Sequence, residues 1–213
     1  MTDTLQAERH LSRSDEDGAK RRQIIDGARS IFLAQGFDAA SMNDIARAAG
    51  VSKGTLYVYF KDKEQLFEAI VAEECRAHAE SVFDTVNKDD DVKTVMTNIG
   101  IAFVNMLCRP EKVSAVRTVI AIADRAPETG RKFFETGPAV GLARLKAYLD
   151  DQVRAGTLQI EDTEIAAAQF IESCHATMFK PVLFNFGPPP SQDRIRYCIG
   201  IAVRTFLAAY QPK

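Results

Sequence analysis

The sequence has few of the features that mark secreted, membrane or metal-binding proteins. Its cysteines, Cys75, Cys108, Cys174 and Cys198, are far apart and form no C-x-x-C pair, which favours reduced, buried thiols over a disulfide framework. No segment approaches about 18 uninterrupted apolar residues. The N-terminus also lacks the apolar core of a signal peptide. We therefore expect a cytoplasmic protein that does not enter a membrane.

Motifs of the common catalytic sites are missing as well. The histidines are His10, His78 and His175, and the chain has no H-x-x-x-H pair, glycine-rich phosphate loop or G-x-S-x-G sequence. Cys174 and His175 are neighbours in a predicted helix, where adjacent side chains point about 100° apart and make a poor catalytic pair. We expect no enzyme activity, no cofactor and no metal.

Net charge is small, but its distribution along the chain is uneven. The formal net charge of −2 does not indicate a polyanion partner for the chain as a whole. Residues 1–19 carry two basic and five acidic side chains, whereas residues 20–65 carry eight basic and five acidic ones. A positive excess in one segment is what a local DNA contact requires.

Helical periodicity continues along almost the whole chain, and no alternating run of β-branched residues is bounded by turns. The pattern predicts an all-α protein of about nine helices. Gly137 and Pro138 lie inside one predicted helix and should kink it or reduce its regularity. The predicted helices span residues 19–36, 41–49, 52–60, 63–86, 92–108, 111–125, 128–155, 162–184 and 191–210.

The first residues are polar, charged and without a pattern, which indicates a disordered arm over residues 1–17. Arg9 and Arg13 could reach a DNA minor groove from this arm. Because the arm is acidic overall, a solvated tail is the simpler interpretation.

Residues 41–60 predict two short helices joined by a tight turn. Ser41 can cap the first helix by accepting from the backbone N–H of Asp44. Gly50 follows the last helical residue, where a left-handed conformation is expected, and Ser52 caps the second helix. Small, polar and basic groups therefore lie at the exposed start of the second helix, as entry into a major groove requires. Many helical proteins that bind no nucleic acid also contain such a pair.

The continuation of this segment resembles the TetR family of transcriptional regulators. The resemblance covers about residues 20–70 and rests on F-x-x-x-G-F, D-I-A-x-x-A-G-V-S, G-T-L-Y-x-Y-F and K-x-x-L, all in one register. The family implies an N-terminal helix-turn-helix domain, here residues 18–78, and a helical ligand-binding and dimerisation domain, here residues 79–213. The helix order read from periodicity agrees with this division.

The resemblance also implies which residues contact DNA. Lys53 could donate to guanine or to a phosphate, and Gly54 would let the helix approach base edges closely. Tyr57 could contact a phosphate or could be a core tyrosine with its hydroxyl at the surface. Val58 departs from the aromatic residue that many members carry. The implied contacts are Ser41, Ser52, Lys53, Gly54, Thr55, Tyr57, Tyr59 and Lys63.

The rest of the chain is similar to the branch with an AefR-like C-terminal domain. The positions that carry this similarity are Arg117, residues 125–128, Phe133 with Phe134, Gly137 with Pro138, and Gly156. The branch implies a ligand site between the long C-terminal helices, although ordinary core packing would explain the same apolar residues. The ligand candidates are Phe103, Met106, Val119, Phe134, Phe170, Cys174 and Met178.

The last two predicted helices resemble the family's dimer interface. Their apolar stripes are wide enough for a four-helix contact across a two-fold axis, but they would also serve an internal core. We thus expect a homodimeric repressor that binds a palindromic double-stranded DNA operator and is released by an unidentified small apolar or aromatic effector. The alternative is a helical structural or interaction protein without DNA binding.

Overall fold

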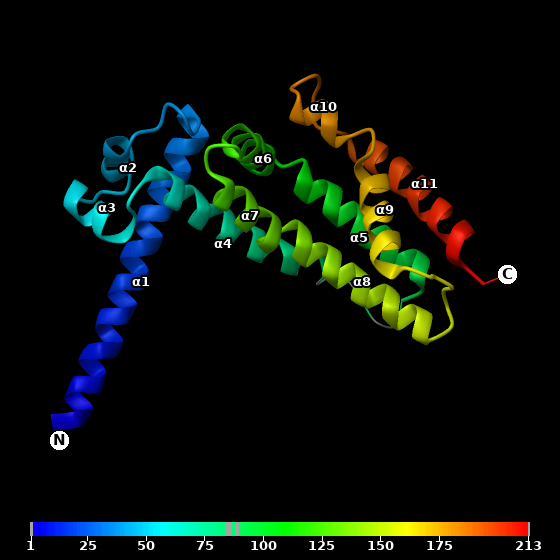
Figure 1. The fold of residues 1–213 in the computed structure, drawn as a ribbon, viewed down its shortest axis with the longest axis horizontal. Helices are drawn as coiled ribbons and strands as arrows, with labels where there is room; N and C mark the ends of the chain where they lie inside the picture. Colours follow the sequence, from blue (N-terminus) through cyan, green and yellow to red (C-terminus); the bar gives the residue numbers. More distant parts are fainter. Residues whose placement is uncertain (1, 84–86, 88–89, 213) are drawn as a thin grey trace. The chain divides into compact units, whose positions relative to one another are not determined.

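The computed structural model describes the backbone of residues 2–83, 87 and 90–212, and the side chains of that part apart from residues 2–15 and 75–81. The described residues form eleven α-helices and no strand, which confirms the predicted all-α class (Figure 1). The chain divides into two compact units, Met1–Val71 and Ala72–Lys213. No helix in the described ranges is both long and apolar enough to cross a bilayer.

Unit 1 is built around a cluster of three phenylalanine rings. Phe32, Phe37 and Phe67 lie with ring centroids 5.3–5.9 Å apart, and two of the three contacts are edge-to-face. The cluster joins the end of the first helix to the start of the fourth. The helices of this unit are α1 (Thr2–Gln35), α2 (Met42–Ala48), α3 (Lys53–Tyr59) and the first part of α4 (Lys63–Phe83).

The first helix is longer than the sequence predicts. The backbone is helical from Thr2, whereas we expected an irregular arm over residues 1–17. No proline interrupts the first 35 residues and the first glycine is Gly18, so nothing in this segment ends a helix that is held further along by buried Ile24 and Ile25. The side chains of Arg9 and Arg13 lie outside the described residues.

Unit 2 packs its helices around an apolar core. Helix α11 lies against α5 and α9, and α8 lies against α9 (Figure 1). The fully buried side chains include Met96, Leu145, Leu149 and Ile199. Besides the end of α4, the helices are α5 (Val92–Leu107), α6 (Pro110–Ile122), α7 (Pro127–Thr136), α8 (Pro138–Arg154), α9 (Thr163–His175), α10 (Phe179–Leu183) and α11 (Gln192–Tyr210).

Two predicted helices are each divided in the structure, which raises the number of helices above the prediction. The run over residues 128–155 breaks at Gly137, and Pro138 begins α8 because its missing N–H is not needed at the first helical position. The run over residues 162–184 breaks after His175. Pro181 cannot donate to the carbonyl of Thr177, and its ring crowds that carbonyl, so α10 starts as a separate turn.

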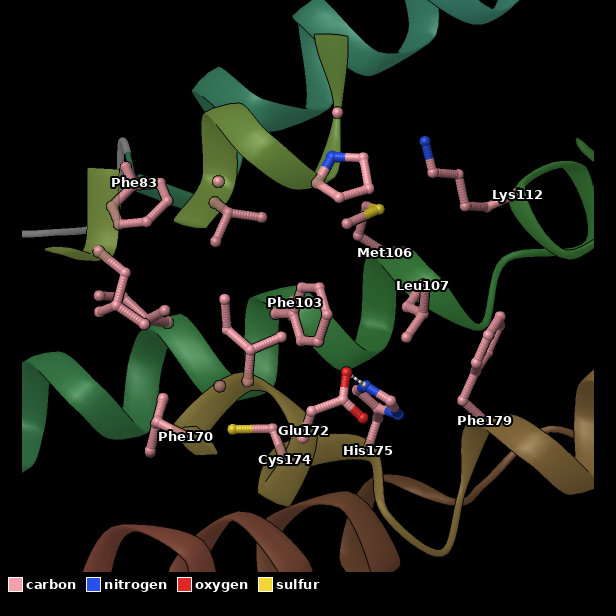
Figure 2. Close-up of a pocket in the computed structure, with 18 of the residues that line it drawn as sticks. Phe83, Phe103, Met106, Leu107, Lys112, Phe170, Glu172, Cys174, His175 and Phe179 are labelled. Carbon is pink, nitrogen blue, oxygen red and sulfur yellow. Dashed lines mark ion pairs between the residues drawn. The ribbon is translucent and has the colours of Figure 1, made fainter. Parts of the chain in front are cut away.

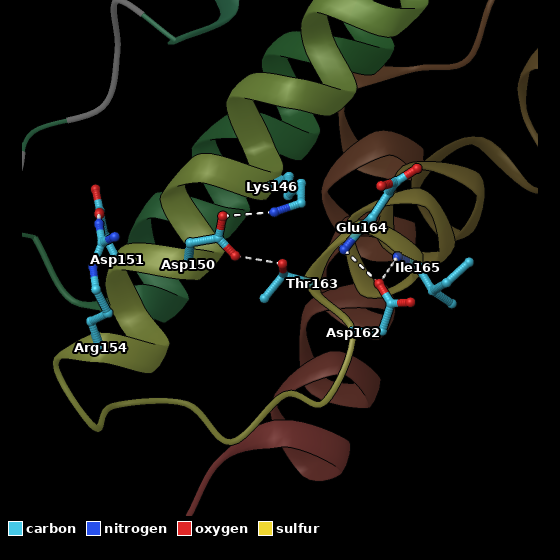
Figure 3. A network of polar contacts seen from close by, with 8 residues as sticks. All are labelled: Lys146, Asp150, Asp151, Arg154, Asp162, Thr163, Glu164 and Ile165. Carbon is cyan, nitrogen blue, oxygen red and sulfur yellow. Dashed lines mark hydrogen bonds and ion pairs between the residues drawn. The ribbon is translucent and has the colours of Figure 1, made fainter.

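A polar network fixes the start of α9 against α8 (Figure 3). Asp150 accepts from Lys146 at 2.8 Å and from the Thr163 hydroxyl at 2.5 Å, and these bonds lower the pKa of Asp150. Asp162 caps α9 by accepting from the backbone N–H groups of Glu164 and Ile165. The orientation of α9 is therefore set at its N-terminus, and its later turns carry side chains of the cavity described below.

Candidate nucleic-acid interface and ligand cavity

The turn between α2 and α3 has the geometry that the sequence predicts. Ser41 accepts from the backbone N–H of Asp44 at 3.1 Å, and Ser52 accepts from that of Thr55 at 3.0 Å. Gly50 adopts a φ of 62°, in the left-handed region that favours glycine. The two caps and the turn therefore determine where α3 begins. Ser52 is exposed, and its cap is a contact within α3.

The surface of α3 divides into one buried residue and a largely exposed remainder. Leu56 is fully buried, while Lys53 and Gly54 are exposed and Tyr57 is 45% exposed. Tyr57 is thus a surface residue, and the Lys53 ammonium lies 5.9 Å from the centroid of its ring. Val58 is 81% exposed and leaves an apolar position on this surface.

Tyr59 is held by a residue far away in sequence. Its hydroxyl donates to the Asp17 carboxylate on α1 at 2.6 Å, and this bond raises the pKa of Tyr59. A phosphate that accepts from Tyr59 would have to replace Asp17. The end of α3 is therefore linked to α1 through a polar contact that sequence spacing did not reveal.

Lys63 has a structural role in unit 1. Its ammonium donates to the carbonyls of Phe37 and Asp38 at 2.9 and 3.1 Å, with Ala40 at 3.4 Å, and lies 4.7 Å from the centroid of the Phe37 ring. These contacts use the donors of the ammonium on the loop before α2. The expected phosphate contact at Lys63 would have to break them.

Unit 2 contains a cavity of about 330 Å³ between α5, α6, α7, α8 and α9 (Figure 2). Its wall is mostly apolar and includes the rings of Phe83, Phe103, Phe133, Phe170 and Phe179. Gly137 and Pro138 at the break between α7 and α8, and Gly141 in the first turn of α8, also line it. A cavity of this size and lining suits a small apolar or aromatic compound.

The cavity includes four of the seven ligand candidates, namely Phe103, Met106, Phe170 and Cys174. The other three lie elsewhere. Val119 and Met178 are buried but are not part of the lining, and Phe134 is 58% exposed. On α7 the ring that faces the cavity is Phe133. It lies one helical turn after Thr129, and the structure shows that Thr129 is buried. No sequence signal separated Phe133 from its neighbour Phe134.

Sequence reasoning missed the polar residues of the cavity: Lys112, Glu172 and His175. His175 was considered only as a partner of Cys174. It follows Ile171, another lining residue, by four positions, so the two share a face of α9. This spacing was the available signal. Cys174 contributes an apolar surface, because burial raises the pKa of its thiol to about 12.

Large apolar side chains are exposed around α10 and α11. Tyr197 and Ile201 are 62% and 40% exposed and lie four residues apart on α11. Phe184 and Phe186, which follow α10, are 76% and 87% exposed. Single exposed apolar residues are ordinary, but several on neighbouring turns mark an interaction surface.

Two family models match this chain. Residues 24–70 match the model described as bacterial regulatory proteins, tetR family, and residues 94–212 match the AefR-like transcriptional repressor, C-terminal domain. The curated HTH-type transcriptional repressor Rv1474c of Mycobacterium tuberculosis is 31% identical over 140 residues, which cover 66% of this chain and 67% of that protein. The match to the regulator AcrR of Shigella flexneri is 46% identical but covers only 24% of this chain and 23% of that one.

Solved structures extend the similarity to nearly the whole length. A TetR-family transcriptional regulator from Mesorhizobium loti has a TM-score of 0.85 and 28% identity, covering 92% of this chain and 98% of its own. The flavonoid-responsive regulator FrrA has a TM-score of 0.75 and 30% identity, covering 92% and 99%. The similarity therefore includes both units.

Proposed function

Because this chain belongs to the TetR family of transcriptional regulators and has an AefR-like C-terminal domain, we propose that it is a ligand-responsive repressor that reads its operator through α3. The family is one of DNA-binding regulators and not of enzymes. The observation that carries the proposal is the start of α3. There the capped helix exposes Lys53 and Gly54 to solvent, while Leu56 on the same helix is buried and anchors it.

The proposed DNA contacts divide by chemistry. Lys53 and Thr55 contact base edges or phosphates, and Gly54 allows the helix to approach. Tyr57 and Tyr59 donate to phosphates, with Tyr59 leaving Asp17 to do so. Ser41 and Ser52 cap α2 and α3, and the exposed backbone N–H groups at these helix N-termini bind phosphates. We omit Lys63 because its ammonium is bound to loop carbonyls.

The second part of the proposal concerns the effector. The aromatic cavity of unit 2 is the binding site, and its ligand is a small apolar or aromatic molecule. The 30% identity to a flavonoid-responsive regulator over nearly the whole chain supports an aromatic effector. Ligand favours a conformation in which the paired recognition helices no longer match the operator, and DNA is released.

The third part is the assembly. The protein acts in the cytoplasm as a dimer through α9, α10 and α11, with recognition helices one or more DNA turns apart, about 34 Å for adjacent major-groove faces. The exposed apolar residues on α11 and after α10 support this choice of surface.

A mobility-shift assay with the DNA next to the protein's own gene tests the regulator function. We expect saturable binding at low salt that is specific for that DNA over a shuffled sequence, and its loss on addition of an aromatic effector. Undetectable binding at low salt would instead favour a helical interaction protein without DNA binding.

A further inference from the structure

His175 lies at the end of α9 in the wall of the cavity and is nine-tenths buried. Its Nδ1 is one of two buried side-chain polar atoms that have no hydrogen-bond partner within the described part of the chain. Its Nε2 is 3.5 Å from the Glu172 carboxylate, which is too long for a strong hydrogen bond. Buried polar groups are nearly always satisfied, so an unpartnered nitrogen beside a cavity points to a ligand that supplies its hydrogen-bond partner.

Two aromatic rings flank the imidazole. Phe103 and Phe179 each place a ring centroid 5.9 Å from that of His175, on two sides (Figure 2). In the present conformation water does not reach Nδ1. A rotation of the ring toward the cavity would break no hydrogen bond at Nδ1, because Nδ1 makes none. The ring is held by two aromatic contacts and by the long contact from Nε2 to Glu172, so Nδ1 can turn to a polar group that enters the cavity.

The charges of the lining constrain the ligand further. Lys112 on α6 and Glu172 on α9 have opposite charges, so the cavity side chains carry no excess of either sign. The Lys112 ammonium lies 5.3 Å from the centroid of Phe133. Because the wall carries no net charge and is otherwise apolar, an uncharged molecule fits it better than a charged one.

We propose that the effector is an uncharged aromatic compound with a hydroxyl group, and that this hydroxyl forms a hydrogen bond with the His175 imidazole. A hydroxyl suits the site because it can donate to a ring nitrogen that carries no hydrogen and can accept from a ring N–H. Phenylalanine side chains from α4, α5, α7, α9 and α10 surround the aromatic part. This inference rests on the proposed effector function of the same cavity.

Isothermal titration calorimetry with flavone and each of its monohydroxylated derivatives tests the proposal on the full chain. We expect at least one derivative to bind the wild type about ten-fold more tightly than flavone, since a buried hydrogen bond that satisfies an unpaired group has this magnitude. His175→Phe keeps an aromatic ring of similar size and should remove the preference while flavone still binds. His175→Leu serves as a second replacement should the first variant not fold.

Two results would overturn the proposal: a wild type that binds no derivative more tightly than flavone, or a hydroxyl preference that persists in the His175 variants. The regulator function is measured separately, by the mobility shift of ligand-free wild type. If the ligand-free wild type binds no DNA, the regulator function is contradicted and the His175 result still stands. If it binds DNA but shows no hydroxyl preference, only the His175 contact is contradicted.

Discussion

At the scale of single residues, Lys53 is the side chain from which we expect the largest effect on DNA binding. It is the basic residue at the start of α3, and its ammonium lies above the ring of Tyr57, which is itself exposed. Lys53→Ala should weaken operator binding about ten-fold or more, because a base or charged phosphate contact is worth about 1–3 kcal/mol. Fluorescence anisotropy with labelled operator measures this change.

The same titration distinguishes the two roles of Lys53. A contact to guanine predicts a loss confined to operator DNA, and a contact to phosphate predicts an equal loss on random DNA. Lys93→Ala, which removes the same charge from an exposed position in the first turn of α5, is the matched control and should bind like the wild type. Equal affinity of Lys53→Ala and wild type for both DNAs would remove Lys53 from the interface.

The buried hydroxyl of Tyr148 should make the folded state less stable at alkaline pH. Its hydroxyl is buried without a hydrogen-bond partner, and burial raises its pKa from 10.0 to about 12 in the folded state. The neutral form is thus favoured in the folded state. Its contribution to stability is complete below pH 10 and is lost as the pH rises from about 10 to about 12, by up to about 2 kcal/mol.

Tyr148→Phe removes this titration. We expect urea unfolding midpoints of the variant to fall less steeply than those of the wild type above pH 10, and to be equal or higher at pH 7. The same steepness in both proteins would show that Tyr148 does not govern the alkaline loss.

At the scale of elements, the crossing of α1 and α2 depends on the absence of a side chain at Gly27. A Cβ at this position would lie 2.7 Å from the backbone and Cβ of Ala49, just after α2. Gln23, one turn earlier, donates to the Ala49 carbonyl at 2.6 Å and fixes the same approach. Close packing of α1 on the end of α2 therefore sets where the turn to α3 lies.

Gly27→Ala should separate these elements. We expect it to lower the free energy of unfolding of unit 1 by about 1–3 kcal/mol and to weaken DNA binding, since overpacking moves the backbone. Gly18→Ala is the control on the same helix, because a Cβ there meets nothing within 4 Å, and it should leave stability equal or slightly higher. Urea unfolding followed by circular dichroism measures both, and wild-type stability in Gly27→Ala would contradict the close approach.

Helix ends show how far sequence reasoning reaches at this scale. Ser41, Gly50 and Ser52 were identified correctly because a cap or a left-handed glycine is determined by residues within one turn. The break at Gly137 was expected only as a kink or a less regular stretch of one helix. Whether a Gly-Pro pair bends a helix or divides it depends on what packs against the two halves, and that is not a local property.

At the scale of the whole molecule, the exposed apolar residues of α11 bear on assembly. Ile201→Glu places a charge where the proposed dimer would bury an isoleucine, so we expect a monomer by light scattering and a large loss of operator affinity. Arg196→Ala, on another face of the same helix, should remain dimeric. A stable dimer of Ile201→Glu would place the interface elsewhere.

Fold class, the caps of the α2–α3 pair and family membership follow from the sequence alone, because each depends on periodicity or on residues in one short register. Only the tertiary structure showed that Phe133 rather than Phe134 lines the cavity, that Lys63 is bound to the carbonyls of Phe37 and Asp38, and that His175 lies unpartnered among phenylalanines. These facts depend on side chains far apart in sequence. Periodicity tells which face of a helix is apolar, but the packing of other helices decides whether that face fills a core or borders a cavity.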